Sequence, residues 1–178
     1  MDESVAIVVC RMGLMLFAGE TAMRDGTKHG YALKLEWTGN DGAGTEGYRS
    51  YRREYRLTAA GKVLIEGSSD PTFRGDRTKW NPEEMLLAAL SACHMLSYLH
   101  ECAVNGVVVT AYEDDAVGEM VEDSLSAKFQ RVVLRPRVTV ADVGMKGKAD
   151  ELHHAAHEKC FIARSVNFLV ECEAGVTA

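Results

Sequence analysis

The first third of the chain alternates apolar and polar residues over short distances. Residues 31–37 alternate with a period of two, which predicts a half-buried strand. Residues 48–58 alternate again with arginines on both faces, and this pattern predicts a solvent-exposed antiparallel strand. A turn at Gly61 and a short strand at 63–65 follow, and a polar loop extends over 67–79. This region therefore predicts three strands.

A long apolar pattern with clear end signals follows the loop, over residues 82–104. Asn81 is a good N-cap, Pro82 suits the first helical position, and two glutamates come next, at the positive end of the helix dipole. Gly106 provides a stop signal. The pattern predicts a helix about 34 Å long, at about 1.5 Å per residue. We expect so long and apolar a helix to be central and well buried.

The rest of the chain predicts further strands and a second helix. Strands are expected at 107–112, 116–121 and 127–140, and Pro136 indicates an edge or a bulge in the last of them. A second helix over 149–164 precedes a strand at 166–172. The strands come in runs and do not alternate with helices, which predicts an α+β fold.

Length and charge limit the classes of protein. A chain of 178 residues is within the size of one core, and we expect a variable extension over residues 1–28 and one domain over 29–178. The net charge of −6 gives no broad basic field, which argues against nucleic acid as a partner. The apolar runs are too short for a membrane span, and acidic residues precede the first of them, which does not fit a secretory signal. We therefore expect a cytoplasmic protein.

Five cysteines, at positions 10, 93, 102, 160 and 172, lack the regular spacing of a disulfide scaffold. Cys93 lies seven residues after Leu86 and three before Leu96, on the expected apolar stripe of the long helix. Cys160 has a similar position on the second helix. Periodicity alone favours packed core thiols at both positions, and it permits a reactive site without arguing for one.

Two segments around these cysteines carry a family resemblance. The first is NPEEMLLAALSACHMLSYL, and the second is AHEKCFIARSV. They resemble, in order, the two signatures of the OsmC/Ohr family, and the order of elements matches over residues 31–172. The resemblance implies an OsmC-like fold with antiparallel sheets, a long central helix and a second helix, in an intertwined homodimer. Many members of the family reduce organic hydroperoxides or hydrogen peroxide through two cysteines.

The resemblance also implies roles for particular residues. It places the peroxide-attacking nucleophile at Cys93, the resolving cysteine at Cys160 and a catalytic glutamate at Glu83. It further implies an arginine beside the active thiolate, for which Arg74 is the first choice, with Arg77 and Arg49 as alternatives. Attack on an O–O bond requires a thiolate, which an arginine can hold, and Glu83 would orient that arginine through a bidentate pair.

Three further expectations complete this picture. Glu83 and Cys93 are about 15 Å apart on one straight helix, so we expect two sites at a homodimer interface, each with a partner's carboxylate. The resemblance implies no metal, flavin or haem, and an external dithiol reductant, either a dihydrolipoyl group or thioredoxin. After attack, Cys160 would trap the sulfenic acid of Cys93, which requires Cα atoms within about 7 Å.

The histidines and the remaining cysteines allow other interpretations of the sequence. His153, His154, His157 and Glu158 have a spacing that could face a metal, but a solvated helix face is the simpler interpretation. His94 is expected to pack or hydrogen-bond, and Cys102 and Cys172 to be structural. A second function class is a catalytically weak OsmC-like protein that binds a hydrophobic small molecule, with structural cysteines. The sequence does not distinguish the preferred peroxide.

Overall fold

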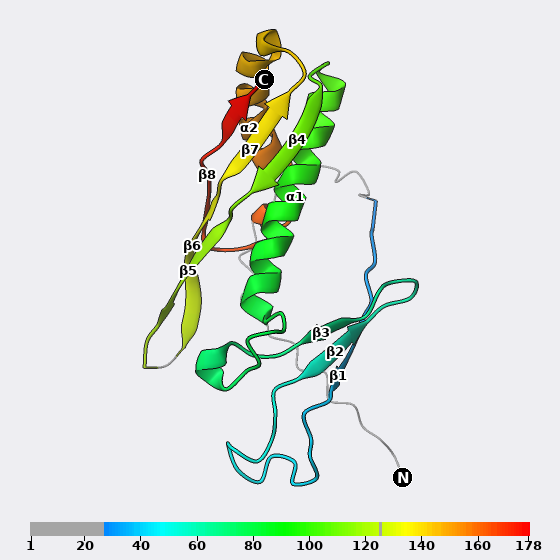
Figure 1. Cartoon of the computed structure of the whole chain (residues 1–178), viewed down its shortest axis with the longest axis vertical. Helices are drawn as coiled ribbons and strands as arrows, with labels where there is room; N and C mark the ends of the chain where they lie inside the picture. Colours follow the sequence, from blue (N-terminus) through cyan, green and yellow to red (C-terminus); the bar gives the residue numbers. More distant parts are fainter. Residues whose placement is uncertain (1–26, 125) are drawn as a thin grey trace, which may run out of the picture. The chain divides into compact units, whose positions relative to one another are not determined.

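The structure is a computed structural model that describes residues 27–124 and 126–178 (Figure 1). The chain divides into two units, Met1–Ala32 and Leu33–Ala178, and the second contains every helix and strand of the described residues. The predicted extension at 1–28 and Cys10 therefore lie almost entirely outside the described residues. No helix in the described ranges is long and apolar enough to cross a membrane.

The first three strands form an antiparallel sheet in the order β1-β2-β3. Their bounds are Lys34–Trp37 for β1, Tyr55–Thr58 for β2 and Ile65–Gly67 for β3. The prediction of three strands is confirmed, although the second is much shorter than 48–58. The expectation of a half-buried first strand is wrong, since β1 is exposed along its whole length, with Leu35 at 58%. Gly61 forms the expected turn, at a φ of 70°.

The long helix α1 spans Pro82–Val104, with the ends that the sequence predicts. Asn81 caps it through a capping box, in which its side chain accepts from the Glu84 N–H and the Glu84 carboxylate accepts from the Asn81 N–H. The prediction of a well-buried helix is only half right. The buried face holds Leu90, His94, Tyr98, Glu101 and Cys102, whereas Leu96 on another face is 63% exposed.

The remaining strands form two more three-stranded sheets, in the orders β4-β7-β9 and β5-β6-β8. Their bounds are Val109–Asp114 for β4, Val117–Glu122 for β5, Ala127–Leu134 for β6, Pro136–Val140 for β7, Leu169–Cys172 for β8 and Gly175–Thr177 for β9. The predicted strand at 127–140 is two strands in different sheets. The break falls at Arg135, where the backbone N–H leaves the ladder and donates to Asp114 at 2.7 Å.

The last two strands run parallel to β6 and β7 with one constant register. Leu169 pairs with Arg131 in one sheet, and Thr177 pairs with Thr139 in the other. The sequence offset is 38 residues in both cases (169 − 131 and 177 − 139). The segment β8–β9 therefore follows β6–β7 across the break between the two sheets.

The second helix, α2, spans Lys146–Lys159 and is therefore shorter at its C-terminal end than predicted. It packs against α1 and β9. Between α1, α2 and the strands lies the larger core cluster, made of Tyr98, Cys102, Val107, Val138, Val140, Ala149, Leu152, Ala156 and Val176. Helices pack on mixed sheets, and the α+β class is confirmed.

Candidate active site

Two cysteines from different helices meet in the structure. Cys93 lies in the middle of α1 and is half-buried, and Cys160 directly follows α2 and is 1% exposed. The two thiols are free, and Cys93 lies close enough to Cys160 to raise the pKa of Cys160. The turn after Cys160 also binds both sulfurs, because the Ile162 N–H donates to Cys93 Sγ and the Ala163 N–H to Cys160 Sγ, each at 3.5 Å.

The surroundings of Cys160 disfavour its thiolate. Burial is the main cause that raises the pKa of this thiol, and the hydrogen bond and charge of Cys93 raise it further. The N–H groups of Ile162 and Ala163 act in the opposite direction and do not cancel the effect of burial. The pair is therefore asymmetric, with a buried, protonated thiol beside a more accessible one.

An apolar groove of about 660 Å³ opens beside Cys93. Its walls come from one side of α1 and from the end of α2: Ala89, Ala92, Cys93, Leu96, Ser97, His100, Glu101, Lys159 and Phe161. Phe161 is 79% exposed at its rim. One ion pair lies in the wall, between the Lys159 ammonium and the buried Glu101 carboxylate at 2.7 Å. An organic molecule with an apolar body could therefore reach the Cys93 sulfur.

Glu83 is not brought to the cysteine pair in one chain. It lies in the first turn of α1 and lines a different hollow, with Phe73, Gly118 and Phe129. Its Oε2 is buried and has no hydrogen-bond partner among the described residues, and the same holds for the Tyr55 hydroxyl. Burial and then the nearby Glu83 carboxylate raise the pKa of Tyr55. A buried carboxylate oxygen without a donor is costly, which points to a missing partner group.

None of the three candidate arginines meets Cys93 in the described part of the chain. Arg74 ends the short 3-10 helix Pro71–Phe73 with a left-handed φ of 67°, and its side chain is exposed. Arg77 and Arg49 are exposed as well. No arginine among the described residues lines the groove at Cys93. Residues 27–124 and 126–178 of the same chain therefore do not supply this thiol with the cation that the resemblance implies.

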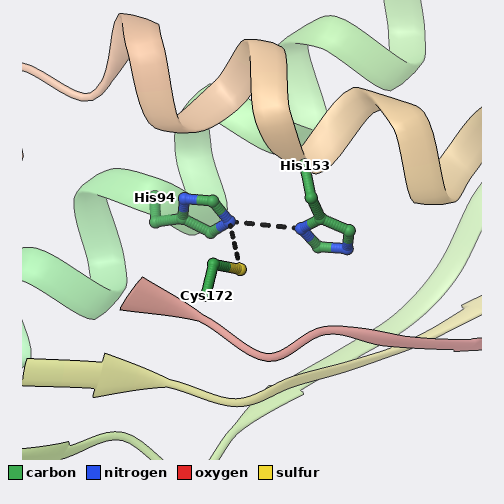
Figure 2. Close-up of side chains that lie close together, drawn as sticks. All are labelled: His94, His153 and Cys172. Carbon is green, nitrogen blue, oxygen red and sulfur yellow. Dashed lines mark hydrogen bonds between the residues drawn. The ribbon is translucent and has the colours of Figure 1, made fainter. Parts of the chain in front are cut away.

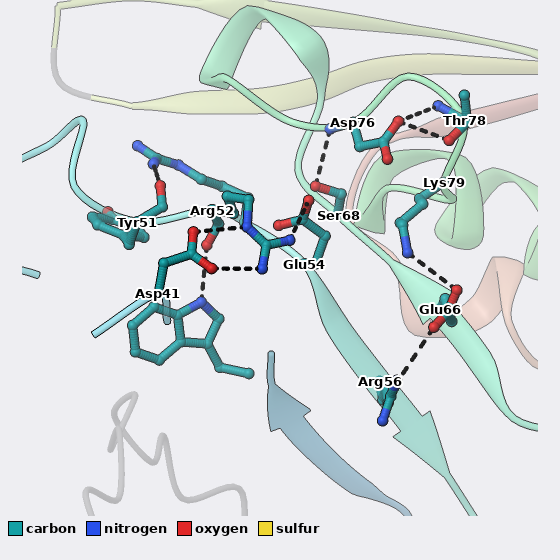
Figure 3. A network of polar contacts seen from close by, with 12 residues as sticks. Asp41, Tyr51, Arg52, Glu54, Arg56, Glu66, Ser68, Asp76, Thr78 and Lys79 are labelled. Atoms are coloured by element: carbon teal, nitrogen blue, oxygen red, sulfur yellow. Dashed lines mark hydrogen bonds and ion pairs between the residues drawn. The ribbon is translucent and has the colours of Figure 1, made fainter. Parts of the chain in front are cut away.

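Arginines near the first sheet have other partners, as Figure 3 shows. The Arg52 guanidinium donates to both oxygens of Asp41, at 2.9 and 2.8 Å, and also pairs with Glu54. The Arg56 side chain pairs with Glu66, which also accepts from Lys79 at 3.1 Å. The side chains of Arg52 and Arg56 are each 53% exposed, so this face is solvated, as the sequence suggests, and it also carries a network of ion pairs.

Comparison with known proteins assigns the chain to a family. The family model of the OsmC-like proteins matches residues 75–174, and the match includes both cysteines and Glu83. The chain belongs to the OsmC-like family. An OsmC-like protein of unknown function from Vibrio cholerae is 30% identical, with a TM-score of 0.73 over 83% of this chain and 100% of that chain. No curated protein matches this OsmC-like chain.

More distant relatives share the OsmC-like fold. An organic hydroperoxide resistance protein OsmC from Legionella pneumophila is 15% identical and has a TM-score of 0.58, over 84% of this chain and 98% of that one. The organic hydroperoxide resistance protein OhrB of Bacillus subtilis is 20% identical and has a TM-score of 0.53, over 83% and 98%. At these identities the likeness establishes the fold alone.

This OsmC-like protein has a second cluster of polar side chains, made of His94, His153 and Cys172 (Figure 2). His94 directly follows Cys93 in the sequence. His94 Nε2 lies 3.2 Å from His153 Nδ1 and 3.5 Å from Cys172 Sγ. The interpretation of His153 as part of a solvated helix face is wrong, since it is 5% exposed and stacks on Tyr98, with ring centroids 3.8 Å apart. His154 and Glu158 do fit that interpretation, with side chains 83% and 67% exposed. The expected hydrogen bond of His94 is confirmed.

Burial controls the protonation of this cluster. It is the main cause that lowers the pKa of His94 and of His153 to about 4 each, so both rings are neutral at pH 7. Burial also raises the pKa of Cys172 to about 11, and the charge of Asp114 adds to this effect. A spacing of four along α1, from Leu90 to His94 to Tyr98, is the sequence signal that could have placed His94 in the core.

Proposed function

We propose that this OsmC-like protein is a thiol-dependent peroxidase that reduces organic hydroperoxides or hydrogen peroxide. The observation that carries the proposal is the proximity of Cys93 and Cys160, whose sulfurs accept from neighbouring N–H groups of one turn, with Cys93 at an apolar groove. Cys93 is the nucleophile because it is the accessible member of the pair. Cys160 is the resolving cysteine because it is buried behind it. The apolar walls of the groove favour organic hydroperoxides as the substrate class.

In the proposed reaction, the Cys93 thiolate attacks the terminal oxygen of the hydroperoxide. The O–O bond breaks, the alkoxide takes a proton and leaves as the alcohol, and Cys93 becomes a sulfenic acid. The Cys160 thiolate then attacks the Cys93 sulfur, so that an S–S bond forms and water leaves. An external dithiol, for which a dihydrolipoyl group is the first choice, reduces the disulfide and returns both thiols.

The proposal includes two shared sites in a homodimer. Glu83 and Cys93 are ten residues apart on the continuous helix α1, about 15 Å, and they line different hollows. The unpartnered Oε2 of Glu83 supports a role in binding an arginine, such as Arg74, beside the partner's thiolate. In this arrangement each thiolate receives its positive neighbour from across the interface.

Trapping the disulfide tests the chemistry directly. The reduced protein is mixed with less than one equivalent of an organic hydroperoxide, and peptides are mapped by mass. A peroxidase gives a bond between Cys93 and Cys160 within seconds and one alcohol per bond. A protein that remains reduced would be the ligand-binding alternative, in which the groove binds a hydrophobic molecule.

Single cysteine variants test the division of roles. Cys93→Ser should abolish peroxide consumption, whereas Cys160→Ser should react once and then stop as a sulfenic or over-oxidised acid. Cys102→Ala is a matched control, because Cys102 is also a buried free thiol but lies in the core cluster. Equal residual turnover in the Cys93 and Cys160 variants would contradict the assignment.

A mixing experiment tests whether the sites are shared. Cys93→Ser and Glu83→Ala should each be nearly inactive alone, since Glu83→Ala removes the group that orients the arginine. After the two variants exchange subunits, shared sites should restore about a quarter of the wild-type rate, because about half of the dimers are mixed and each has one complete site. If Glu83 and Cys93 act within one chain, mixing restores nothing, and the shared site is excluded.

A further inference from the structure

The cluster of His94, His153 and Cys172 lies outside the proposed peroxidase chemistry. Its three side chains come from α1, α2 and β8, which are far apart in the sequence (Figure 2). One ligand atom of each, His94 Nε2, His153 Nδ1 and Cys172 Sγ, lies within 4.8 Å of the other two. Imidazole and thiolate are ligands that zinc prefers. We propose that His94, His153 and Cys172 form a zinc site in this protein.

The distances agree with the geometry of tetrahedral zinc. Zinc binds nitrogen at about 2.05 Å and sulfur at about 2.3 Å, so tetrahedral angles place two nitrogens about 3.3 Å apart and a nitrogen and a sulfur about 3.5 Å apart. The observed separations are 3.2 Å for the two nitrogens and 3.5 Å from His94 Nε2 to the sulfur. The third pair, His153 Nδ1 and Cys172 Sγ, lies within 4.8 Å, so a rotation of the Cys172 side chain toward His153 would complete the geometry.

The hydrogen bonding of the cluster is compatible with an ion. His94 Nε2 faces both His153 and Cys172, so without an ion one nitrogen serves two neighbours. The outer nitrogens, His94 Nδ1 and His153 Nε2, are buried without a hydrogen-bond partner among the described residues. Binding of zinc moves the ring protons to these outer nitrogens and turns all three lone pairs toward the ion. No additional buried group loses a partner.

Charge and access are consistent with a divalent cation. The Asp114 carboxylate lies near both His94 and Cys172, and its negative charge favours a cation between them. Asp114 itself is held by the Ser91 hydroxyl at 2.5 Å and the Arg135 N–H at 2.7 Å, so it acts through its charge and is not a ligand. Cys172 is only half-buried, which leaves a route for the ion. Water takes the fourth position.

Binding involves no electron transfer. The zinc ion replaces the proton of the Cys172 thiol, which passes to solvent, and the thiolate and two neutral imidazoles bind the metal. The site ties α1, α2 and β8 together. The bound ion therefore stabilises the folded chain as long as it does not bind the unfolded chain equally well.

Cobalt(II) is the probe, since a thiolate bound to it gives a charge-transfer band and tetrahedral geometry gives strong visible absorption. The full chain carries Cys93→Ser and Cys160→Ser, so that the peroxidase thiols cannot bind metal. We expect one Co²⁺ per chain with both absorptions, displacement by one Zn²⁺, and a higher melting temperature with Zn²⁺. Absence of the charge-transfer band, or a melting temperature unchanged by Zn²⁺, would overturn the site.

Three variants in this background locate the ion. Cys172→Ala should abolish the charge-transfer band, and His153→Gln should weaken Zn²⁺ binding at least about tenfold. His154→Gln is the matched control, one residue away on α2 and exposed, and should bind as the parent does. Circular dichroism without metal shows which variants fold. If His153→Gln does not fold, the result of Cys172→Ala, which removes only the sulfur, decides whether the site exists. A band that survives Cys172→Ala contradicts the proposal.

Discussion

Burial distinguishes the two cysteines of the proposed site at the scale of single residues. Cys160 is 1% exposed and its pKa is raised, whereas Cys93 borders the groove. A thiol that remains protonated does not compete for the peroxide, but it must lose its proton before it can attack a sulfenic acid. In the proposed reaction, the burial of Cys160 would therefore limit the rate of disulfide closure.

This asymmetry predicts the pH dependence of the second step. Burial, the largest cause of the raised pKa of Cys160, persists after Cys93 is oxidised. The thiolate fraction below the pKa rises about tenfold per pH unit, so disulfide closure should accelerate strongly from about pH 6 to about pH 9. Rapid quenching and mass analysis after one equivalent of peroxide measures closure, and Cys160→Ser reports the attack step separately. A closure rate that is flat over this range would refute the prediction.

The ion pair in the groove wall gives a prediction for stability. Glu101 is 5% exposed, and its carboxylate accepts from Lys159 at 2.7 Å. Lys159→Met leaves this carboxylate without its cation, and the free energy of unfolding should fall by about 1–3 kcal/mol, less than for a fully buried pair because Lys159 is 60% exposed.

A second lysine on α2 is the control for this change. Lys148 pairs with Glu151, and both side chains are largely exposed. Lys148→Met should change the free energy of unfolding by no more than about 0.5 kcal/mol in the same urea titration. Equal effects of the two substitutions would show that burial of Glu101 does not matter.

At the scale of elements, helix α1 carries two of the residues proposed to act in the reaction. Its first turn carries Glu83 and its middle carries Cys93. The residue at which α1 begins therefore determines where the Glu83 carboxylate lies. The capping box of Asn81 and Glu84 defines this end. A well-defined helix start is therefore a requirement for the site as well as for stability.

The cap gives a prediction of its own. Asn81→Ala should lower the free energy of unfolding by about 1 kcal/mol, because the Glu84 N–H loses its acceptor, and Asn81→Asp should retain most of the stability. Peroxide turnover should decrease in the alanine variant as the first turn of α1 becomes less ordered around Glu83. Chemical denaturation measures the first effect. An alanine variant as stable as the parent would mean that the capping box contributes nothing.

Helix α1 was the easiest element to predict because its signals are local. Asn81, Pro82 and Gly106 mark its ends through backbone chemistry that acts within a few residues. The strands were harder, since residues 48–54 alternate like a strand but lie outside β2. Their arginines and aromatic rings make local contacts instead, such as Arg53 stacked 4.0 Å from the Tyr51 ring centroid.

The candidate site was predictable only in part. Family motifs predicted the two cysteines, and the structure places them close together. The periodicity of the sequence predicts the wrong buried face of α1, since Leu96 is 63% exposed and His94 is fully buried. The histidine cluster could not be predicted, because it depends on long-range packing that brings Cys172 of β8 beside α1.

At the scale of the whole molecule, many large apolar side chains are exposed to solvent in the single chain. In and directly before the strands of the first sheet, Leu33, Leu35 and Val63 are 65%, 58% and 90% exposed, and Leu96 on α1 is 63% exposed. Leu33, Val63 and Ile65 line one hollow, and monomeric proteins rarely expose large contiguous apolar patches. The exposure supports the homodimer in which the shared sites are proposed.

The dimer is tested by mass in solution. Light scattering should give the mass of two chains of 19.5 kDa each. Leu35→Glu should shift the mass toward one chain and reduce peroxide turnover, because a charge would be buried at the interface. Val143→Glu is the control, since Val143 is 73% exposed outside the sheets and should not affect assembly. A wild-type chain that is monomeric at full activity would exclude the shared-site proposal.

The constant offset of 38 residues between β6–β7 and β8–β9 has a consequence for synthesis. A ribosome releases β6 and β7 before α2 and well before their parallel neighbours. Until Leu169 and the residues after it emerge, β6 and β7 each have one unpaired side, which β8 and β9 cover in the finished chain. Translation that stops ahead of that point should leave a product that pairs with other chains and aggregates.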